Sequence, residues 1–216
     1  MQIDFVRAHT EPAALPFLPE LKLRQAAEAI PLWELMEQVT GRKGLPPPFW
    51  AFAWAGGQGL ARYVLDHPAT VAGQTVLDLA AGSGLVALAA ARAGASRVIA
   101  NEIDEYADAA IALNADLNGV AVERALGDLL RTPPEVPLPE ADVVLAGDVF
   151  YSRDMAAAML GFLRRQHERG ALVLVGDPGR AYRPTTGFEQ VAAFRVPVNA
   201  DLEDADLKHT TVLRMV

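Results

Sequence analysis

A glycine-rich turn between a short apolar run and an alanine-rich run constrains the fold of this chain most strongly. The run TVLDLA (residues 75–80) precedes the turn AGSG, and the run LVALAAARAG, which has helical composition, follows it. Gly82 and Gly84 allow a sharp turn and let a ligand lie against the backbone, and Ala87 permits close packing of helix on strand. The pattern predicts a strand–turn–helix unit whose helix N-terminus offers free N–H groups.

The same rhythm continues along the chain. Further apolar runs occupy residues 97–102, 121–126, 142–147 and 171–177, and helical stretches occupy residues 106–118 and 155–168. Alternating strands and helices indicate a parallel sheet with right-handed crossovers and helices on both faces. Residues 188–198 and 209–216 have no helix between them, so we expect a terminal antiparallel β-hairpin joined by the acidic loop NADLEDADLK. The predicted fold class is α/β, a doubly wound, mostly parallel, seven-stranded Rossmann-like sheet.

The region before this domain is expected to be different. Residues 1–48 are predicted to form an N-terminal helical extension, ahead of a domain spanning residues 49–216. Residues 20–38 carry an incomplete apolar stripe typical of a helix, in which Pro31 is expected to cause a kink or a break. A run of three prolines at positions 46–48 marks a connector, and residues 58–66 predict a short helix.

Composition excludes several classes of function. The 216 residues are 51% hydrophobic, which is enough to bury a core. The chain has no cysteine and its four histidines are scattered, so we expect no metal site and no cysteine nucleophile. A net charge of −8 argues against nucleic acid as a partner and suits a basic protein segment. With no signal peptide and no long apolar run, we expect a cytoplasmic protein without membrane contact. We also expect a monomer.

A carboxylate follows the second strand at a suggestive distance. Glu102 stands 18 residues after Gly84, where it can bind the two ribose hydroxyls of an adenosine. A glycine turn alone is weak evidence, but a strand before it, a helix after it and an acid at the next strand end together indicate a nucleoside-type cofactor. The alternative is a tight turn with a surface glutamate.

The cofactor could be a dinucleotide or S-adenosylmethionine, and three features favour the second. Asp78 lies just before the glycines, where it would repel a pyrophosphate but attract an ammonium or a sulfonium. The N-terminal region can cover the site. Asp128 follows the third strand, where it can accept a hydrogen bond from an adenine amino group; alternatively, it only caps a helix.

The fourth strand ends in Asp148-Val-Phe-Tyr151. Because ligands of open α/β sheets bind at the carboxyl ends of strands, this carboxylate and this phenol can face one pocket. Methyl transfer needs a neutral nucleophile in line with the methyl group, and an aspartate can hold and orient an amine. In the alternative interpretation, Asp148 caps the following helix and Tyr151 lies in the core.

Four segments together resemble the seven-β-strand class I methyltransferases, family 16, a group marked by an Asp-x-x-Tyr motif after the fourth strand. The segments are PPPFWAFAWAGGQGLARYVLDHP, VLDLAAGSGLVALAAARAGASRVIANEIDEYA, DVVLAGDVFYSRDM and VLVGDPGRAY. Within this family, the chain resembles the electron-transfer-flavoprotein β-subunit lysine methyltransferase branch, which includes bacterial members. The glycine loop is common to class I methyltransferases, whereas the Asp148/Tyr151 motif, the Trp54 segment and Asp177-Pro-Gly-Arg180 are more specific.

This resemblance implies roles for individual residues. Asp148 and Tyr151 would be catalytic. The residues expected to bind S-adenosylmethionine are Trp54, Asp78, Ala80, Gly82, Gly84, Glu102 and Asp128. Trp54 could instead pack in the core, and Arg180 could meet substrate or be a solvated charge. Ala80 departs from the pattern, since many relatives carry a glycine there.

The resemblance further implies a protein-lysine N-methyltransferase whose substrate is the electron transfer flavoprotein β-subunit. Fold does not fix the substrate, so a small-molecule methyltransferase remains an alternative. An NAD-dependent oxidoreductase is disfavoured by Asp78. A non-catalytic module that binds the cofactor only for stability is a further alternative.

Overall fold

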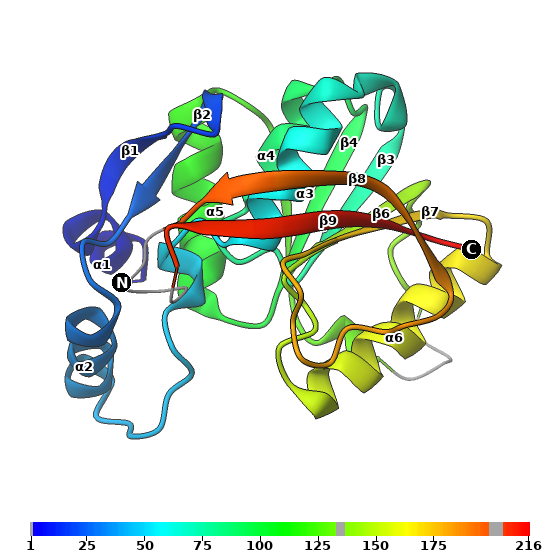
Figure 1. Cartoon of the computed structure of the whole chain (residues 1–216). Helices are drawn as coiled ribbons and strands as arrows, with labels where there is room; N and C mark the ends of the chain where they lie inside the picture. Colours follow the sequence, from blue (N-terminus) through cyan, green and yellow to red (C-terminus); the bar gives the residue numbers. More distant parts are fainter. Residues whose placement is uncertain (1, 133–136, 199–204) are drawn as a thin grey trace.

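The computed structural model describes residues 2–132, 137–198 and 205–216, and it contains a mixed seven-stranded sheet (Figure 1). The strands lie in the order β5-β4-β3-β6-β7-β9-β8. The parallel strands are β3 (Thr75–Leu79), β4 (Arg97–Glu102), β5 (Glu123–Leu126), β6 (Val143–Gly147) and β7 (Leu172–Asp177). β9 (Leu207–Met215) pairs antiparallel with both β7 and β8 (Phe188–Pro197). The predicted fold class, with its terminal antiparallel strands, is confirmed, and most of the predicted acidic loop lies outside the described residues.

Helices cover both faces of the sheet because successive residues of each central strand point to opposite sides. The four helices are α3 (Ala55–Asp66), α4 (Leu85–Arg92), α5 (Glu105–Asn118) and α6 (Arg153–Glu168). Val76 packs in an apolar cluster with α3, α4 and α5, whereas Leu77 packs with α6 on the other face. Short 3-10 helices occupy η1 (Phe49–Ala51), η2 (Pro68–Thr70) and η3 (Leu129–Arg131). Within the described ranges, every helix is too short or too polar to span a bilayer.

The N-terminal region is less helical than the sequence predicts. It consists of α1 (Gln2–His9), a hairpin of β1 (Glu11–Leu15) and β2 (Leu18–Gln25), and α2 (Ala29–Thr40). The predicted helix over residues 20–38 is therefore wrong in its first half, where buried Leu21 and Leu23 alternate with exposed Lys22 in the two-residue period of a strand.

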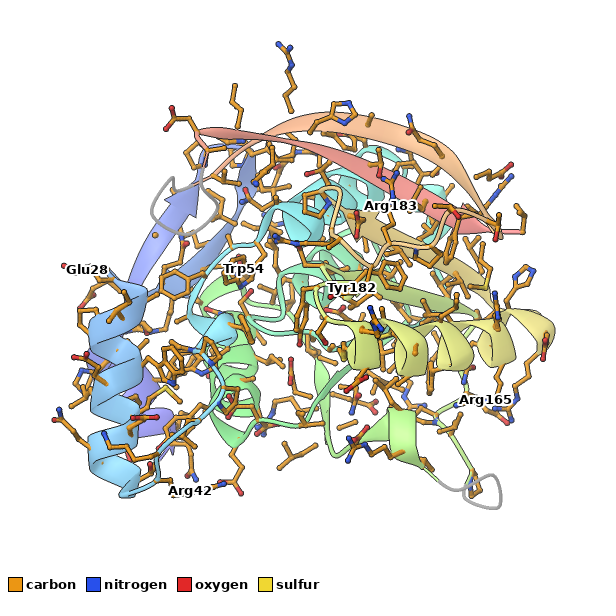
Figure 2. The ribbon with its side chains drawn as sticks, turned by 60° about the horizontal axis from the view of Figure 1, so that its bottom comes forward. Glu28, Arg42, Trp54, Arg165, Tyr182 and Arg183 are labelled. Atoms are coloured by element: carbon orange, nitrogen blue, oxygen red, sulfur yellow. The ribbon has the colours of Figure 1, made fainter. Side chains whose placement is uncertain are left out.

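Pro31 does not break α2, which runs as one helix from Ala29 to Thr40. Pro31 is the third residue of this helix. The first N–H groups of a helix have no acceptor within it, so the missing N–H of a proline costs no hydrogen bond there. In Figure 2, Glu28 and Arg42 mark the two ends of α2, which stands across the molecule from Arg165 on α6. α2 buries Leu32 and Met36 in an apolar cluster with part of α5.

Two asparagines of α5, one helical turn apart, attach the hairpin to the domain. The side chain of Asn118 accepts a hydrogen bond from Lys22 N (2.9 Å) and donates one to Lys22 O (2.7 Å). Asn114 Oδ1 accepts a hydrogen bond from Arg24 N at 2.8 Å. Together they satisfy backbone groups of β2 as a neighbouring strand would. Because Leu21 lies in the same apolar cluster as the central strands, the hairpin shares the core of the domain.

Candidate active site

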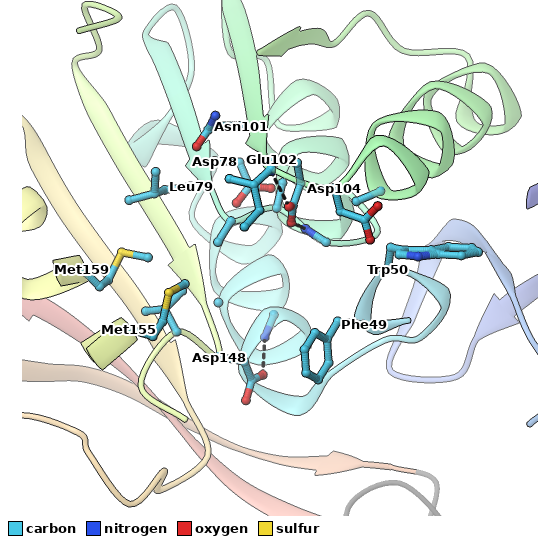
Figure 3. Close-up of a pocket in the computed structure, with 18 of the residues that line it drawn as sticks. Phe49, Trp50, Asp78, Leu79, Asn101, Glu102, Asp104, Asp148, Met155 and Met159 are labelled. Carbon is cyan, nitrogen blue, oxygen red and sulfur yellow. Dashed lines mark hydrogen bonds between the residues drawn. The ribbon is translucent and has the colours of Figure 1, made fainter. Parts of the chain in front are cut away.

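A cavity of about 480 Å³ opens at the carboxyl ends of β3, β4 and β6 (Figure 3). The strand order reverses between β3 and β6, which is where open α/β sheets bind their ligands. The segment around Phe49 closes one side, and Met155 and Met159 of α6 form part of the opposite wall. The cavity therefore combines an apolar lining with polar groups at three strand ends.

The glycine loop after β3 turns through three residues of left-handed backbone. Their φ angles are 55° at Ala80, 56° at Gly82 and 80° at Gly84. A Cβ atom on Gly84 would lie 3.1 Å from Cγ1 of Ile111, so this glycine allows α5 to pack against the loop. Gly82 lines the cavity, and a Cβ there would meet no protein atom within 4 Å. Ala80 adopts the conformation that a glycine would adopt without strain.

Asp78 is buried at the end of β3. Its Oδ2 accepts a hydrogen bond from Ala87 N (2.8 Å) in the first turn of α4, which holds the strand and the helix together across the loop. Burial, supported by the nearby charge of Glu102, raises the pKa of Asp78 to about 8. Asp78 also lines the cavity, as the prediction of a cofactor-binding role requires.

Glu102 holds the loop from the neighbouring strand. Its Oε1 accepts a hydrogen bond from Gly82 N (2.6 Å), and its Oε2 accepts one from Ile103 N (2.9 Å). The side chain lies in the cavity wall, and burial raises the pKa of its carboxyl group. Each oxygen keeps a further lone pair, so Glu102 can accept hydrogen bonds from a ligand while it fixes the loop.

The end of β4 is tied to the turn after β5 by a residue that the sequence reasoning missed. The buried Asn101 donates hydrogen bonds from Nδ2 to Ala125 O (2.7 Å) and Gly127 O (2.9 Å). This places Asp128 at the cavity, where its Oδ1 also accepts from Leu130 N at 3.0 Å and caps η3. Asp128 is thus a helix cap, as the alternative reading held, and a wall residue as well. The available signal was an asparagine directly after the apolar residues Val98, Ile99 and Ala100.

Asp148, just after β6, connects three parts of the molecule. Its Oδ2 accepts hydrogen bonds from Gly56 N and from Gly57 N (3.2 Å) in the first turn of α3. Its Oδ1 accepts from Nε of Arg180 at 2.7 Å, and Nη2 of Arg180 lies 2.5 Å from the same oxygen. Arg180 is therefore an ion-pair partner and not a solvated charge.

The alternative reading, in which Asp148 caps the following helix, is wrong. Ser152 is the N-cap of α6, and its Oγ accepts a hydrogen bond from Met155 N at 3.4 Å. Tyr151 lies at the cavity with 48% of its surface exposed, so it does not lie in the core. Burial raises the pKa of the Tyr151 phenol, with a smaller effect of Glu102, so the phenol is neutral at physiological pH.

Glycines let α3 approach the ends of β6 and β7 closely enough for these bonds. A Cβ on Gly147 would lie 2.8 Å from Cα of Gly57, and a Cβ on Gly176 would lie 2.8 Å from Cβ of Leu60. The helix predicted from the sequence begins at residue 58, whereas α3 begins at Ala55, so the role of Gly56 and Gly57 was missed. Any larger side chain at these positions would move α3 away from Asp148.

Three aromatic rings form a continuous group beside Asp148. Phe49 contacts Trp54 with ring centroids 5.8 Å apart, and it contacts Tyr151 with centroids 5.6 Å apart. Trp54 Nε1 donates a hydrogen bond to Phe49 O at 2.8 Å, and all three rings line the cavity. The partly buried Trp54 is therefore both a packing residue and a wall residue.

The structure brings together at one cavity all the site residues expected from the sequence except Gly84, which supports the loop from behind. The residues that line it are Trp54, Asp78, Ala80, Gly82, Glu102, Asp128, Asp148 and Tyr151. The described residues hold no cluster of three or more carboxylate or histidine side chains suited to a metal ion.

Comparison with known proteins gives consistent matches. The family model for ribosomal protein L11 methyltransferase matches residues 63–148. The chain is 37% identical over 179 residues to the electron transfer flavoprotein beta subunit lysine methyltransferase of Xenopus laevis, covering 82% of this chain and 70% of that protein. It is 40% identical over 167 residues to the protein of the same name from Mus musculus, covering 75% of this chain and 62% of the mouse protein.

Among solved structures, the fold resembles that of a T. thermophilus 16S rRNA methyltransferase in complex with AdoMet and guanosine. The TM-score is 0.60 at 17% sequence identity, and the match covers 96% of this chain and 50% of that one. At this identity the likeness concerns the fold alone.

Proposed function

Because this chain belongs to the family of electron transfer flavoprotein beta subunit lysine methyltransferases, we propose that it methylates lysine side chains of a protein, with the electron transfer flavoprotein β-subunit as its substrate. The relatives confirm the family predicted from the Asp148/Tyr151 motif. The protein is a methyltransferase that uses S-adenosylmethionine. The assignment of the substrate is supported by the names of these relatives, and the match covers about two thirds of their length. A cytoplasmic location and a monomeric state remain parts of this proposal.

The cavity fits this cofactor. S-adenosylmethionine carries two ribose hydroxyls, an adenine amino group and two cationic centres, and carboxylates stand at the strand ends to receive them. We assign Glu102 to the hydroxyls, Asp128 to the adenine and Asp78 to the cationic part, whose positive charge favours the ionised form of this buried carboxyl group. The open space over Gly82 lets a ligand lie against the backbone, and a volume of about 480 Å³ is in the usual range for ligand sites.

The cofactor supplies a methyl group on a sulfonium, which is a good leaving group, so the protein must orient and neutralise the amine. Asp148 attracts the lysine ammonium, accepts its proton and directs the lone pair of the neutral nitrogen toward the methyl group. Phe49, Trp54 and Tyr151 surround the aliphatic part of the side chain and exclude water. The neutral Tyr151 phenol can donate a hydrogen bond to the carboxylate or accept one from the amine.

Labelling of a protein substrate tests the proposal. The purified enzyme is incubated with isotope-labelled S-adenosylmethionine and either recombinant electron transfer flavoprotein β-subunit or a cell lysate. Label is expected on lysines of the β-subunit by tandem mass spectrometry, and free lysine should remain unlabelled. Label confined to small molecules would favour the small-molecule alternative.

A control variant separates binding from chemistry. Gly82→Arg should fill the cavity and abolish the melting shift that S-adenosylhomocysteine produces, while the circular dichroism spectrum stays unchanged. The same melting assay with NAD tests the oxidoreductase alternative, for which NAD and not S-adenosylhomocysteine would stabilise the protein.

A further inference from the structure

A cation lies against one oxygen of Asp148, the residue that we propose to hold the substrate amine. Oδ2 is held by the backbone N–H groups of Gly56 and Gly57 at the start of α3. Oδ1 faces Arg180, which approaches it with both Nε and Nη2. An amine that Asp148 is to orient must therefore compete with the Arg180 guanidinium for Oδ1.

The surroundings of this guanidinium suit cations in general. The Arg180 side-chain carbon Cζ lies 6.0 Å from the centre of the Trp54 ring, within the range of a cation–π interaction. The Trp54 ring contacts Phe49, and Phe49 contacts Tyr151; all three rings line the same cavity. A carboxylate next to aromatic faces is the environment that binds alkylammonium ions.

We propose that Arg180 is a specificity-determining residue which occupies the ammonium site at Asp148 and is displaced from it by the substrate amine. This inference rests on the proposed function. The exchange replaces one cation by another, so the largely buried Asp148 carboxylate stays compensated throughout. A neutral or anionic side chain cannot make this exchange, and the protein thereby selects amine substrates.

The backbone around Arg180 is built to stay in place while the side chain moves. Asp177 is fully buried at the end of β7, and its Oδ1 accepts hydrogen bonds from Gly179 N (2.7 Å) and Arg180 N (3.0 Å). The Arg180 side chain itself is 23% exposed and reaches solvent. Asp148 keeps its position because Oδ2 remains bound to α3 during the exchange.

Steady-state kinetics of three variants test the proposal. Arg180→Met removes the internal competitor, so the KM for the protein substrate should fall about threefold or more, without a matching rise in kcat. Arg180→Lys keeps a cation at the site and should retain a KM near that of the wild type. Arg183→Met is the matched control, because Arg183 hydrogen-bonds to Thr211 of β9 at 3.1 Å and lies over that strand (Figure 2); its KM should not change.

A binding measurement makes the test independent of activity. n-Butylammonium chloride is titrated against each protein loaded with S-adenosylhomocysteine, at constant ionic strength, and the melting temperature is followed. Arg180→Met should be stabilised at lower butylammonium concentrations than the wild type and Arg183→Met.

Three results would overturn the proposal. Equal KM and equal butylammonium response in Arg180→Met and wild type would show that Arg180 does not compete for the site. A raised KM for the protein substrate would mean that Arg180 contacts the substrate directly, and weakened S-adenosylhomocysteine binding would assign it to the cofactor. If the wild type methylates no lysine, the proposed function fails, and the butylammonium titration still decides the role of Arg180.

Discussion

The two oxygens of the Asp148 carboxylate have different partners, and a substitution there affects both. Oδ2 binds the start of α3, and Oδ1 faces Arg180 and the cavity. The residue adopts a left-handed conformation with φ of 61°, which turns its side chain toward α3. The backbone conformation of Asp148 thus helps to position its carboxylate.

Asp148→Asn should lower kcat roughly 10²-fold, because the amide removes the charge that attracts the ammonium. Its NH₂ group must also face either Arg180 or the α3 N–H groups, so the melting temperature should fall. S-adenosylhomocysteine affinity should change little, since Glu102 and the glycine loop remain. Turnover and affinity are measured on the same purified protein, with the milder Tyr151→Phe variant alongside. Turnover near the wild-type value would remove Asp148 from the reaction.

Ala80→Gly should stabilise the protein by about 1 kcal/mol, because Ala80 has a φ of 55° that costs an alanine roughly this much. Urea unfolding monitored by circular dichroism measures the change. Ala81→Gly is the control: Ala81 has no positive φ, so its replacement should destabilise by about 0.5–1 kcal/mol. Equal effects of the two substitutions would contradict the strain at Ala80.

At the level of helices and strands, α5 connects the N-terminal hairpin to the glycine loop. Asn114 is fully buried; its Oδ1 accepts from Arg24 N of β2, and its Nδ2 donates to Ser83 O of the loop at 2.9 Å. One side chain thus joins three segments that are distant in sequence. The hairpin, through this residue, supports the loop that lines the cavity.

Asn114→Ala should lower the free energy of unfolding by about 1–3 kcal/mol, since it leaves buried backbone groups at Arg24 and Ser83 without partners. It should also weaken S-adenosylhomocysteine binding, measured by calorimetry, because the loop loses a support. Asn118→Ala removes the bonds to Lys22 and the bond from Nδ2 to Asn114 O, none of which involves the glycine loop, so it should destabilise less and leave the affinity unchanged. Equal loss of affinity in both variants would mean that the hairpin, and not the loop contact, matters.

Features that depend on neighbouring residues in the sequence could be predicted, whereas contacts between distant segments could not. From residue 75 onward, apolar periods and glycine turns are local signals, and they give the strands, the helices and the strand-end carboxylates. The hairpin was missed because β2 ends at Gln25, close to the start of α2 at Ala29, so the apolar residues of both fit one helical stripe. The ion pair of Asp148 with Arg180 was missed because it depends on how the ends of β6 and β7 meet, which no local pattern encodes.

For the molecule as a whole, carboxyl groups give stability a definite pH dependence. Burial raises the pKa of four of them, namely Asp78, Glu102, Asp104 and Asp177. The folded protein therefore holds protons that the unfolded chain, with carboxyl pKa values near 4, releases. By linkage, their contribution to stability is complete below about pH 4 and is lost as pH rises, up to about pH 8 for Asp78.

Two ion-paired carboxyl groups act in the opposite direction at lower pH. Hydrogen bonds from Lys43 and Arg97 lower the pKa values of Glu37 and Glu123, so this smaller contribution is lost as pH falls below about 4. We expect the free energy of unfolding, and with it the midpoint of urea unfolding, to be highest near pH 5 and to fall toward pH 8. In Asp78→Asn, the decrease of the free energy of unfolding with pH should be smaller by up to about 1.4 kcal/mol per pH unit. A midpoint independent of pH between 5 and 8 would contradict the expectation.

The place of β9 between β7 and β8 has a consequence for the order of folding. β8 precedes β9 in the chain, yet in the part of the chain that the structure describes its neighbour in the sheet is β9. β8 therefore cannot join the sheet before β9 has paired with β7. Until both strands have entered, the edge of β7 and the unpaired β8 are open to chaperones and to aggregation.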